Sequence, residues 1–357
     1  MAVNIVQHIA PIAFLSELRR IELDCAGESS VYFQILMGNL KAQRRIFSAT
    51  YYPDNSGKVT IYDIDRVLES YVEGEPCREV FRFIANGVEL VSPWFAEGSP
   101  EARHECRLLP CRSEVNIPAN MFVEEYFLTT AMEERDICPG RYEYLSYYLQ
   151  ADDQFVTRAT YFNGTELITR DFLRNESAGY GYIKFRPDEY EVEELGQLVS
   201  LVIGCGNRIA RFRVRRDLPE PDPSILFRNS FGGLDVVHFL GTKSNDTKIT
   251  RSTVSVARRM TVYDVTEEPE ITAMTGFILR GLEPVVEDLA RSREVYLIND
   301  SGEPEEIVVT DQDLKYDNDD STLSNLKITY RRVMAGGRIE AYRQPRIFDK
   351  YFDRKFE

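Results

Sequence analysis

The chain has 357 residues and a mass of 41.2 kDa, of which 43% are hydrophobic and 28% are charged. This balance is typical of a globular protein and excludes wholesale disorder, and the length indicates two or three domains. The net charge of −15 argues against a general nucleic-acid coat protein, because such a protein should be basic.

Apolar and polar residues alternate with a period of two through the first part of the chain, as they do in half-buried strands. The pattern predicts strands at 21–25, 31–35, 47–51, 59–61, 79–83 and 106–109. A helix is predicted over 63–73, with Asp63 as its cap and Gly74 as its end. Its apolar residues recur on one helical face: Ile64, Val67, Leu68 and Tyr71.

Turn residues separate several β-rich runs in the middle of the chain. Asn163-Gly164 predicts a tight hairpin, because both positions of a two-residue turn need a positive φ. Gly204-Cys205-Gly206-Asn207 lies between two β-rich runs and predicts a second hairpin. The segment begins like a dinucleotide-binding loop, but it lacks the third glycine and the following helix of such a loop. The succession of short strands favours a β-sandwich of immunoglobulin or fibronectin type.

Three alternate prolines in 217–223 predict a linker, because proline cannot continue a sheet ladder. After it, Pro284 fits the first turn of a helix whose apolar residues are Leu282, Val285, Val286 and Leu289. A hairpin is predicted around 299–302, and a further strand over 326–332.

The expected fold is therefore mainly β, with multi-domain β-sandwich modules and a few short helices. The predicted organisation is a β-rich domain with one short helix at 1–115 and a β-sandwich domain at 116–217. A β-rich domain with one helix follows at 224–340, and 341–357 forms a tail that mixes aromatic and charged residues.

No sequence motif of phosphate binding, dinucleotide binding, metalloprotease or serine hydrolase chemistry occurs. We therefore predict no catalytic residue, no cofactor and no metal. His104 with Cys106 and Cys111 lacks the closely paired ligands of a zinc site. The acidic segment Asp311–Asp320 lacks the EF-hand glycine and glutamate, so calcium binding and a solvated acidic loop both stay open.

Two features are candidate partner-binding sites. Arg211, Arg213 and Arg215 alternate with apolar residues, so one strand face is basic and could bind phosphate or a carboxylate-rich partner. The alternative is the solvent-facing side of an edge strand, where charge prevents edge-to-edge pairing. Trp94, the single tryptophan, could stack on a sugar or pack in a core.

Neither an export signal nor a membrane span is predicted. Polar Asn4, Gln7 and His8 interrupt the first apolar run, and no stretch approaches the roughly 20 apolar residues that span a bilayer. The six cysteines form no CxxC pair and are expected to be reduced thiols. We expect synthesis in the cytoplasm without a signal peptide.

Several stretches together resemble a group of uncharacterised prophage-encoded proteins of gut Bacteroides. The stretches are Asn4-Ile5-Val6-Gln7, Phe14-Leu15-Ser16, Tyr51-Tyr52-Pro53-Asp54, Gly57-Lys58-Val59-Thr60-Ile61, the helix at 63–73, 226–233 and 282–297. The resemblance implies a structural role in a virion or tail. It carries over no active-site residue.

Our first hypothesis is a non-enzymatic structural or adhesion protein of a phage-tail-like assembly, acting through contacts with other tail proteins or with copies of itself. The alternative is a carbohydrate-binding β-sandwich protein with a cell-surface glycan as its ligand. A third reading is a glycoside hydrolase, which would need two carboxylates about 5–10 Å apart in a groove.

Overall fold

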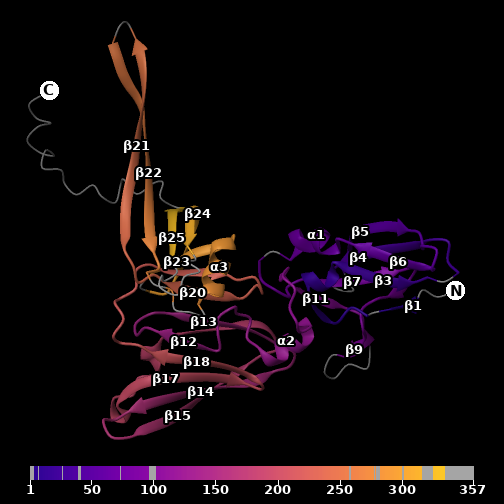
Figure 1. Ribbon diagram of the computed structural model, residues 1–357, viewed down its shortest axis with the longest axis horizontal. Coiled ribbons are helices and arrows are strands. Elements are labelled where there is room, and N and C mark those ends of the chain that lie inside the picture. Colours follow the sequence, from indigo (N-terminus) through magenta and orange to yellow (C-terminus); the bar gives the residue numbers. More distant parts are fainter. Residues whose placement is uncertain are drawn as a thin grey trace, which may run out of the picture. The chain divides into compact units, whose positions relative to one another are not determined.

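The structure is a computed structural model that describes residues 4–6, 8–25, 27–38, 42–72, 74–95, 102–256, 259–276, 278, 282–299, 301–315 and 325–333 (Figure 1). The chain forms two compact units. The first unit contains Met1–Leu218, Phe227–Val237 and Arg280–Arg293, and the second contains Pro219–Leu226, His238–Leu279 and Glu294–Glu357.

The expected mainly β, multi-sheet architecture is confirmed. The unit boundary falls at Leu218/Pro219, inside the predicted linker. Segments 227–237 and 280–293, predicted as parts of the domain 224–340, belong to the first unit. The finer division at 115/116 stays a prediction, and the tail 341–357 lies outside the described residues.

Two sheets enclose the first core of the first unit. The larger sheet has the order β2-β11-β7-β4-β5, with β8 paired to β7, and the smaller has the order β1-β3-β6. The larger sheet contains β2 (Ile12–Phe14), β4 (Val31–Met37), β5 (Arg44–Tyr51), β7 (Val80–Ala85), β8 (Val88–Glu89) and β11 (Cys106–Leu109). The smaller contains β1 (Asn4–Ile5), β3 (Arg20–Asp24) and β6 (Lys58–Tyr62). Alternation places Phe33 and Phe83 of one sheet and Leu23 of the other in a common buried cluster.

The predicted helix at 63–73 is shorter than expected. Helix α1 covers Ile64–Leu68, and a 3₁₀ turn, η2, continues over Glu69–Tyr71. Ile64 and Leu68 are buried as the periodicity required. Asp63 occupies the N-cap position, but it has a φ of 61° and its side chain accepts no capping hydrogen bond, so that part of the prediction is wrong.

A second sandwich follows in the same unit. Five strands have the order β12-β18-β17-β14-β15, and β13 pairs with β16. The strands are β12 (Glu134–Ile137), β13 (Glu143–Leu149), β14 (Asp153–Phe162), β15 (Leu167–Glu176), β16 (Gly179–Phe185), β17 (Gln197–Cys205) and β18 (Arg208–Val214). Tyr161, Phe185 and Phe212 from both sheets share one buried cluster. Two 3₁₀ turns, η3 (Pro187–Tyr190) and η4 (Glu193–Leu195), connect β16 to β17.

Both predicted hairpins of this sandwich are present, but the first has a different turn. β14 and β15 are joined by the four residues 163–166 rather than by Asn163-Gly164 alone. Gly164 has a φ of 98°, whereas Asn163 has no positive φ. The Asn163 side-chain oxygen instead accepts the amides of Thr165 and Glu166, both at 2.9 Å. This side-chain turn replaces the expected two-residue turn.

A seven-residue helix, α2 (Ala119–Glu125), packs between the two sandwiches of the first unit and was not predicted. Phe122 and Val123 of α2 share a buried cluster with Phe14, Leu109 and Tyr148. The 3₁₀ turn η1 (Leu15–Leu18) precedes β3 and carries Glu17 towards α2. Helix α3 (Glu283–Arg291), predicted with Pro284 in its first turn, belongs to this unit.

The second unit contains five strands in the order β23-β24-β25-β22-β21. They are β21 (Lys243–Val256), β22 (Arg259–Met274), β23 (Val295–Ile298), β24 (Pro304–Lys315) and β25 (Asn325–Arg332). The predicted hairpin between β23 and β24 is confirmed, and the Asn299 side chain accepts the Glu303 amide at 2.8 Å. The unit boundary runs through β19 (Ser224–Arg228) and β20 (Leu234–His238).

Candidate functional site: a groove beside α2 and a projecting hairpin

The three predicted arginines, Arg211 and Arg213 on β18 and Arg215 directly after it, are neutralised by neighbouring carboxylates. Arg211 pairs with Glu133, and Arg213 lies 2.8 Å from an Asp136 oxygen. Arg215 pairs with Asp136 at 3.2 Å and with Asp217 at 2.7 Å. β18 is not an edge strand, because it lies between β12 and β17, but Arg211 and Arg213 face solvent as that alternative expected. Their role in partner binding stays a prediction.

Trp94 lies in the short strand β9 (Trp94–Phe95), which pairs with β10 (Ala102–Arg103). Its indole N–H donates to the Glu105 carbonyl at 3.1 Å. The Arg103 guanidinium lies 5.5 Å from the centre of the ring. One ring face is thus already covered by a cation, and sugar stacking at Trp94 stays a prediction.

Within the part of the chain that the structure describes, no group of three or more His, Cys, Asp or Glu side chains could hold a metal ion. His104 contacts the Val91 carbonyl at 2.9 Å through Nδ1, and Cys106 and Cys111 are buried free thiols. Asp311 and Asp313 lie on β24, while 316–320 of the acidic segment lie outside the described residues. No helix among the described residues is long and apolar enough to cross a membrane.

Strands β21 and β22 form a long two-stranded ribbon, which we call the arm. The pairing runs from Lys243 opposite Ala273 to Val256 opposite Arg259. β25 pairs with β22 only over Ile271–Met274, so no third described strand supports the rest of the arm. Figure 1 shows the arm extending well beyond the other strands of its sheet.

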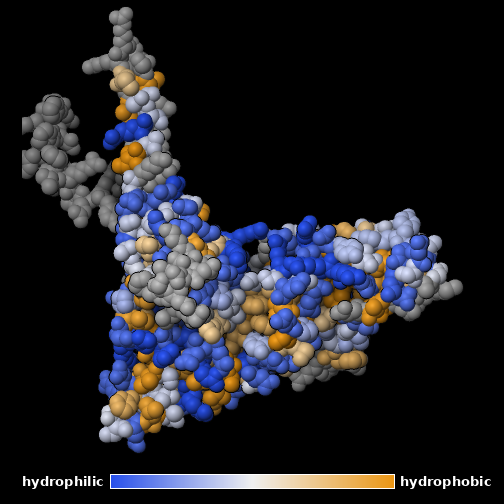
Figure 2. All heavy atoms as spheres, in the orientation of Figure 1, coloured by the Kyte–Doolittle hydropathy of each residue, from blue (hydrophilic) through white to orange (hydrophobic). Residues whose placement is uncertain are grey.

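The arm also exposes large apolar side chains. Met260 is 77% exposed, and Ile249, Val254 and Val262 are exposed as well. Opposite residues share a face and side chains alternate along a strand, so Ile249, Met260 and Val262 lie on one face. Figure 2 shows hydrophobic residues, coloured orange, along this arm.

A groove of about 750 Å³ opens in the first unit beside α2. Its apolar lining includes Phe122 and Phe231, whose rings stack at 4.7 Å, and the exposed side chains of Tyr126, Met132 and Ile209. We call this hollow the groove. It lies where four segments far apart in the sequence meet.

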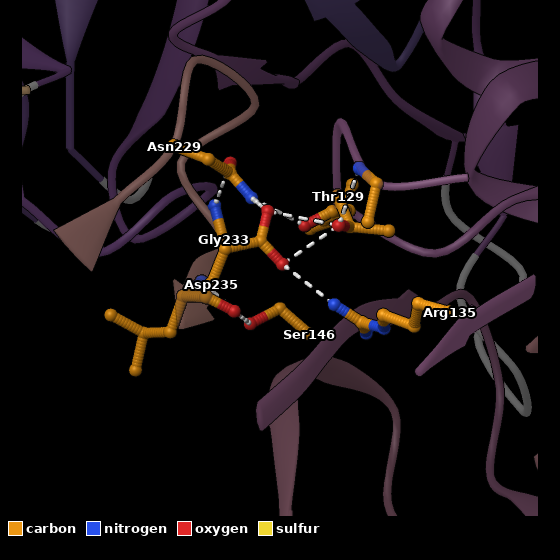
Figure 3. A network of polar contacts seen from close by, with 9 residues as sticks. Thr129, Arg135, Ser146, Asn229, Gly233 and Asp235 are labelled. Atoms are coloured by element: carbon orange, nitrogen blue, oxygen red, sulfur yellow. Dashed lines mark hydrogen bonds and ion pairs between the residues drawn. The ribbon is translucent and has the colours of Figure 1, made fainter. Parts of the chain in front are cut away.

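Arg135, which lines the groove, belongs to a buried polar network (Figure 3). Arg135 is 8% exposed, and its Nη1 lies 3.7 Å from the fully buried Asp235 carboxylate. Asp235 also accepts hydrogen bonds from the Thr129 hydroxyl at 2.7 Å and the Asn229 amide at 2.7 Å. Burial raises the pKa of the Asp235 carboxyl, while Arg135 and these hydrogen bonds oppose the increase.

Asn229 connects this network to the loop between β19 and β20. Its side-chain nitrogen donates to the Leu128 carbonyl at 2.8 Å, and its oxygen accepts the Gly233 amide at 2.9 Å. A Cβ at Gly233 would lie 2.1 Å from the Leu128 carbonyl oxygen, so only glycine fits there. The network therefore fixes the groove wall rather than offering a free carboxylate.

A serine and a histidine lie within hydrogen-bond distance in the described part of the second unit. The Ser224 hydroxyl lies 2.8 Å from His238 Nδ1. Ser224 is buried, so its oxygen is not open to a substrate in this structure. The geometry supports a structural hydrogen bond between β19 and β20.

The residues of the groove and the arm were not predicted as sites. The groove draws on 122–135, 207–210, 231 and 284, and no local pattern joins such distant segments. The arm had a usable signal, because β21 is rich in the β-branched residues that favour strands.

No protein-family model and no curated protein matches this chain. Among solved structures, similarity is found to a chain of the virion of a native gene transfer agent particle, at 10% identity and a TM-score of 0.22. It is also found to a chain of the tail of an empty gene transfer agent particle, at 9% identity and a TM-score of 0.23. Each match covers 32% of this chain and 92% of the other.

A third match is the calcium-binding domain CBD12 of CALX1.1, at 10% identity and a TM-score of 0.17, covering 60% of this chain and 100% of the other. Scores of this size carry no inference about fold or function.

Proposed function

We propose that this chain is a non-enzymatic building block of a phage-tail-like assembly and that the arm joins it to a neighbouring protein subunit. The observation that carries the proposal is the arm itself, a two-stranded ribbon with four exposed large apolar side chains. The origin in a prophage of gut Bacteroides is part of the same proposal.

The physical argument concerns the stability of the arm. An isolated two-stranded hairpin is marginally stable in water, because it lacks a third strand or a packed face. Exposed apolar side chains and unpaired strand edges would also promote unspecific aggregation. A neighbouring subunit that covers one face or pairs with one edge removes both costs, as in β-strand addition.

The experiment compares assembly by the full chain with assembly by an arm variant. The variant Met260→Gln with Val262→Thr makes the exposed face of the arm polar while keeping strand-compatible side chains. The control, Val308→Thr with Val333→Thr, changes two exposed valines outside the arm. Each chain is co-produced with the products of its neighbouring genes, and particle size is measured by sedimentation velocity.

We expect the parent and the control to enter large particles and the arm variant to stay as smaller species. Neighbouring genes for tail-tube, tape-measure or baseplate proteins would support the tail assignment. Equal assembly by the arm variant would refute the role of the arm. Neighbouring genes for glycan uptake or hydrolysis would refute the tail assignment.

A further inference from the structure

The groove combines an apolar lining with one buried cation. Tyr126, Met132 and Ile209 are exposed at the groove. Single exposed apolar residues are common on protein surfaces, but a cluster of them around a hollow is not. Here they surround a concave surface, together with the stacked rings of Phe122 and Phe231. Concave apolar surfaces with a few polar groups are typical of binding sites.

Arg135 supplies the polar group, and it contacts one ion-pair partner and one aromatic ring. Its guanidinium lies 4.8 Å from the Phe212 ring and 3.7 Å from Asp235, but it donates no hydrogen bond to another described residue. The Asp235 oxygens are already taken by Thr129 and Asn229. A guanidinium has five N–H donors. None of the Arg135 nitrogens is among the fully buried side-chain atoms without a partner, so its donors are within reach of a ligand in the groove.

A ligand that satisfies this site needs apolar groups next to a carboxylate. The carboxylate could accept two parallel hydrogen bonds from Arg135, which is the strong bidentate geometry. Exposed Glu125 at the groove would attract basic residues of the same ligand.

The end of this sequence has that composition in a regular pattern. Residues 348–357 read FDKYFDRKFE, in which a phenylalanine is followed by an acidic residue three times, at intervals of four. Basic residues stand between these pairs. In this pattern, each phenylalanine of the segment has a carboxylate as its next neighbour in the sequence.

We propose that the groove binds the segment 346–357 of a second copy of this chain. A phenylalanine of the segment contacts Tyr126 and Ile209, and the neighbouring carboxylate binds Arg135. This inference rests on the proposed role as a building block. The segment and the groove are different surfaces, so the contact is heterologous and can continue from copy to copy.

The test uses the full-length chain and a fluorescent synthetic peptide of residues 346–357, with binding measured by fluorescence anisotropy. A second peptide replaces Asp349, Asp353 and Glu357 by their amides. A groove variant, Tyr126→Ser with Ile209→Thr, is compared with Tyr182→Ser and Val199→Thr, which alter exposed residues of the same unit away from the groove.

We expect saturable binding by the parent and the control. The amide peptide should bind about tenfold more weakly or worse, because hydrogen bonds to charged groups are lost. The groove variant should also bind the acidic peptide about tenfold more weakly. Equal binding of both peptides, equal binding by the groove variant, or no binding at about 1 mM peptide would overturn the inference.

A variant in which Phe348, Phe352 and Phe356 are replaced by alanine shows whether the groove is filled by the segment of the same copy or by that of a second copy. If only this variant binds the peptide and the parent is a monomer, the groove of the parent is filled by the segment of the same copy. That result would overturn the second-copy assignment. The arm variant Met260→Gln with Val262→Thr should bind the peptide like the parent. Failed peptide binding alongside arm-dependent assembly would refute this inference and leave the proposed function standing.

Discussion

The Nε of Arg208 lies 2.7 Å from the carbonyl oxygen of Val123, although 85 residues separate the two in sequence. The same guanidinium donates to the Tyr148 carbonyl at 3.1 Å, and Arg208 is buried. The first residue of β18 thereby links α2 and β13, and its sequence neighbours Asn207 and Ile209 line the groove. The carbonyl oxygens of Val123 and Tyr148 receive charged donors that water cannot easily replace.

Replacement of Arg208 by alanine should therefore destabilise the first unit strongly. The variant leaves two buried carbonyl groups without their donors, and we expect a loss of about 2–4 kcal/mol in the free energy of unfolding. The measurement is urea unfolding followed by circular dichroism. Arg211→Ala, on the same strand but exposed and paired with Glu133, should cost at most about 1 kcal/mol. Equal losses for the two variants would contradict this reading of Arg208.

Glu17 connects η1 to the start of α2 and should stabilise that helix end. Its Oε1 accepts the Ala119 amide at 2.7 Å and the Phe14 amide at 3.3 Å. Glu17→Ala removes the acceptor from the first turn of α2, so we expect a loss of about 1–2 kcal/mol. Glu17→Gln keeps an oxygen acceptor and should lose less.

Hydrogen exchange at the Ala119 amide measures this effect directly. Faster exchange in Glu17→Ala, with Glu17→Gln between that variant and the parent, is the expected order. Unchanged protection of Ala119 in the alanine variant would show that Glu17 does not cap α2.

The buried carboxyl of Asp235 predicts a specific pH dependence. Burial raises its pKa above the ordinary value of 3.8, so the folded chain binds the proton more tightly than the unfolded chain. The stability from this carboxyl is then fully present below pH 3.8 and is lost as the pH rises through the folded pKa. Asp235→Asn cannot ionise and does not undergo this loss.

The unfolding free energy of Asp235→Asn, relative to that of the parent, should therefore increase as the pH rises from about 3.5 to 7. Unfolding curves at several pH values measure it. Leu234→Asn, next to Asp235 but outside the ion pair, is the control for a general pH effect. A difference that stays constant, or that moves towards the parent, would contradict the raised pKa.

The elements predicted from sequence were those whose determinants are local. Helix α3 buries three apolar residues, Val285, Val286 and Leu289, and has Pro284 in its first turn. The Asn299 hairpin has its own side-chain turn. Helix α2 was missed because seven residues with Pro118 at the N-cap give a weak local signal, and the side chain that accepts the Ala119 amide, Glu17, is distant in the sequence. Asp63 failed as a cap because its backbone adopts a left-handed conformation.

The candidate sites depend on contacts that no local pattern encodes. Arg135 and Asp235 are 100 positions apart, and each alone reads as an ordinary charged residue. The alternating arginines of β18 were visible, but the carboxylates that neutralise Arg211 and Arg213 come from β12 and the residue before it. Strand pairing that joins distant segments is decided by the whole core rather than by propensity.

Buried thiols give the last prediction. All six cysteines are free and buried, and burial raises the pKa of Cys77 to about 12 and those of Cys111 and Cys138 to about 11. The thiolate is the reactive form, so the folded chain at pH 7.5 should react with a thiol reagent more than about tenfold more slowly than the unfolded chain. In guanidinium chloride, all six thiols should react rapidly.

The same shifts predict loss of stability in alkali. Each folded pKa lies above the ordinary value of 9.0, so the stability from these thiols is present below pH 9.0 and is lost as the pH rises towards 11 and 12. The urea midpoint should fall above pH 9, and Cys77→Ala should reduce that fall because one titrating thiol is removed. A Cys77→Ala variant with the same alkaline decline as the parent would show that Cys77 does not contribute to it.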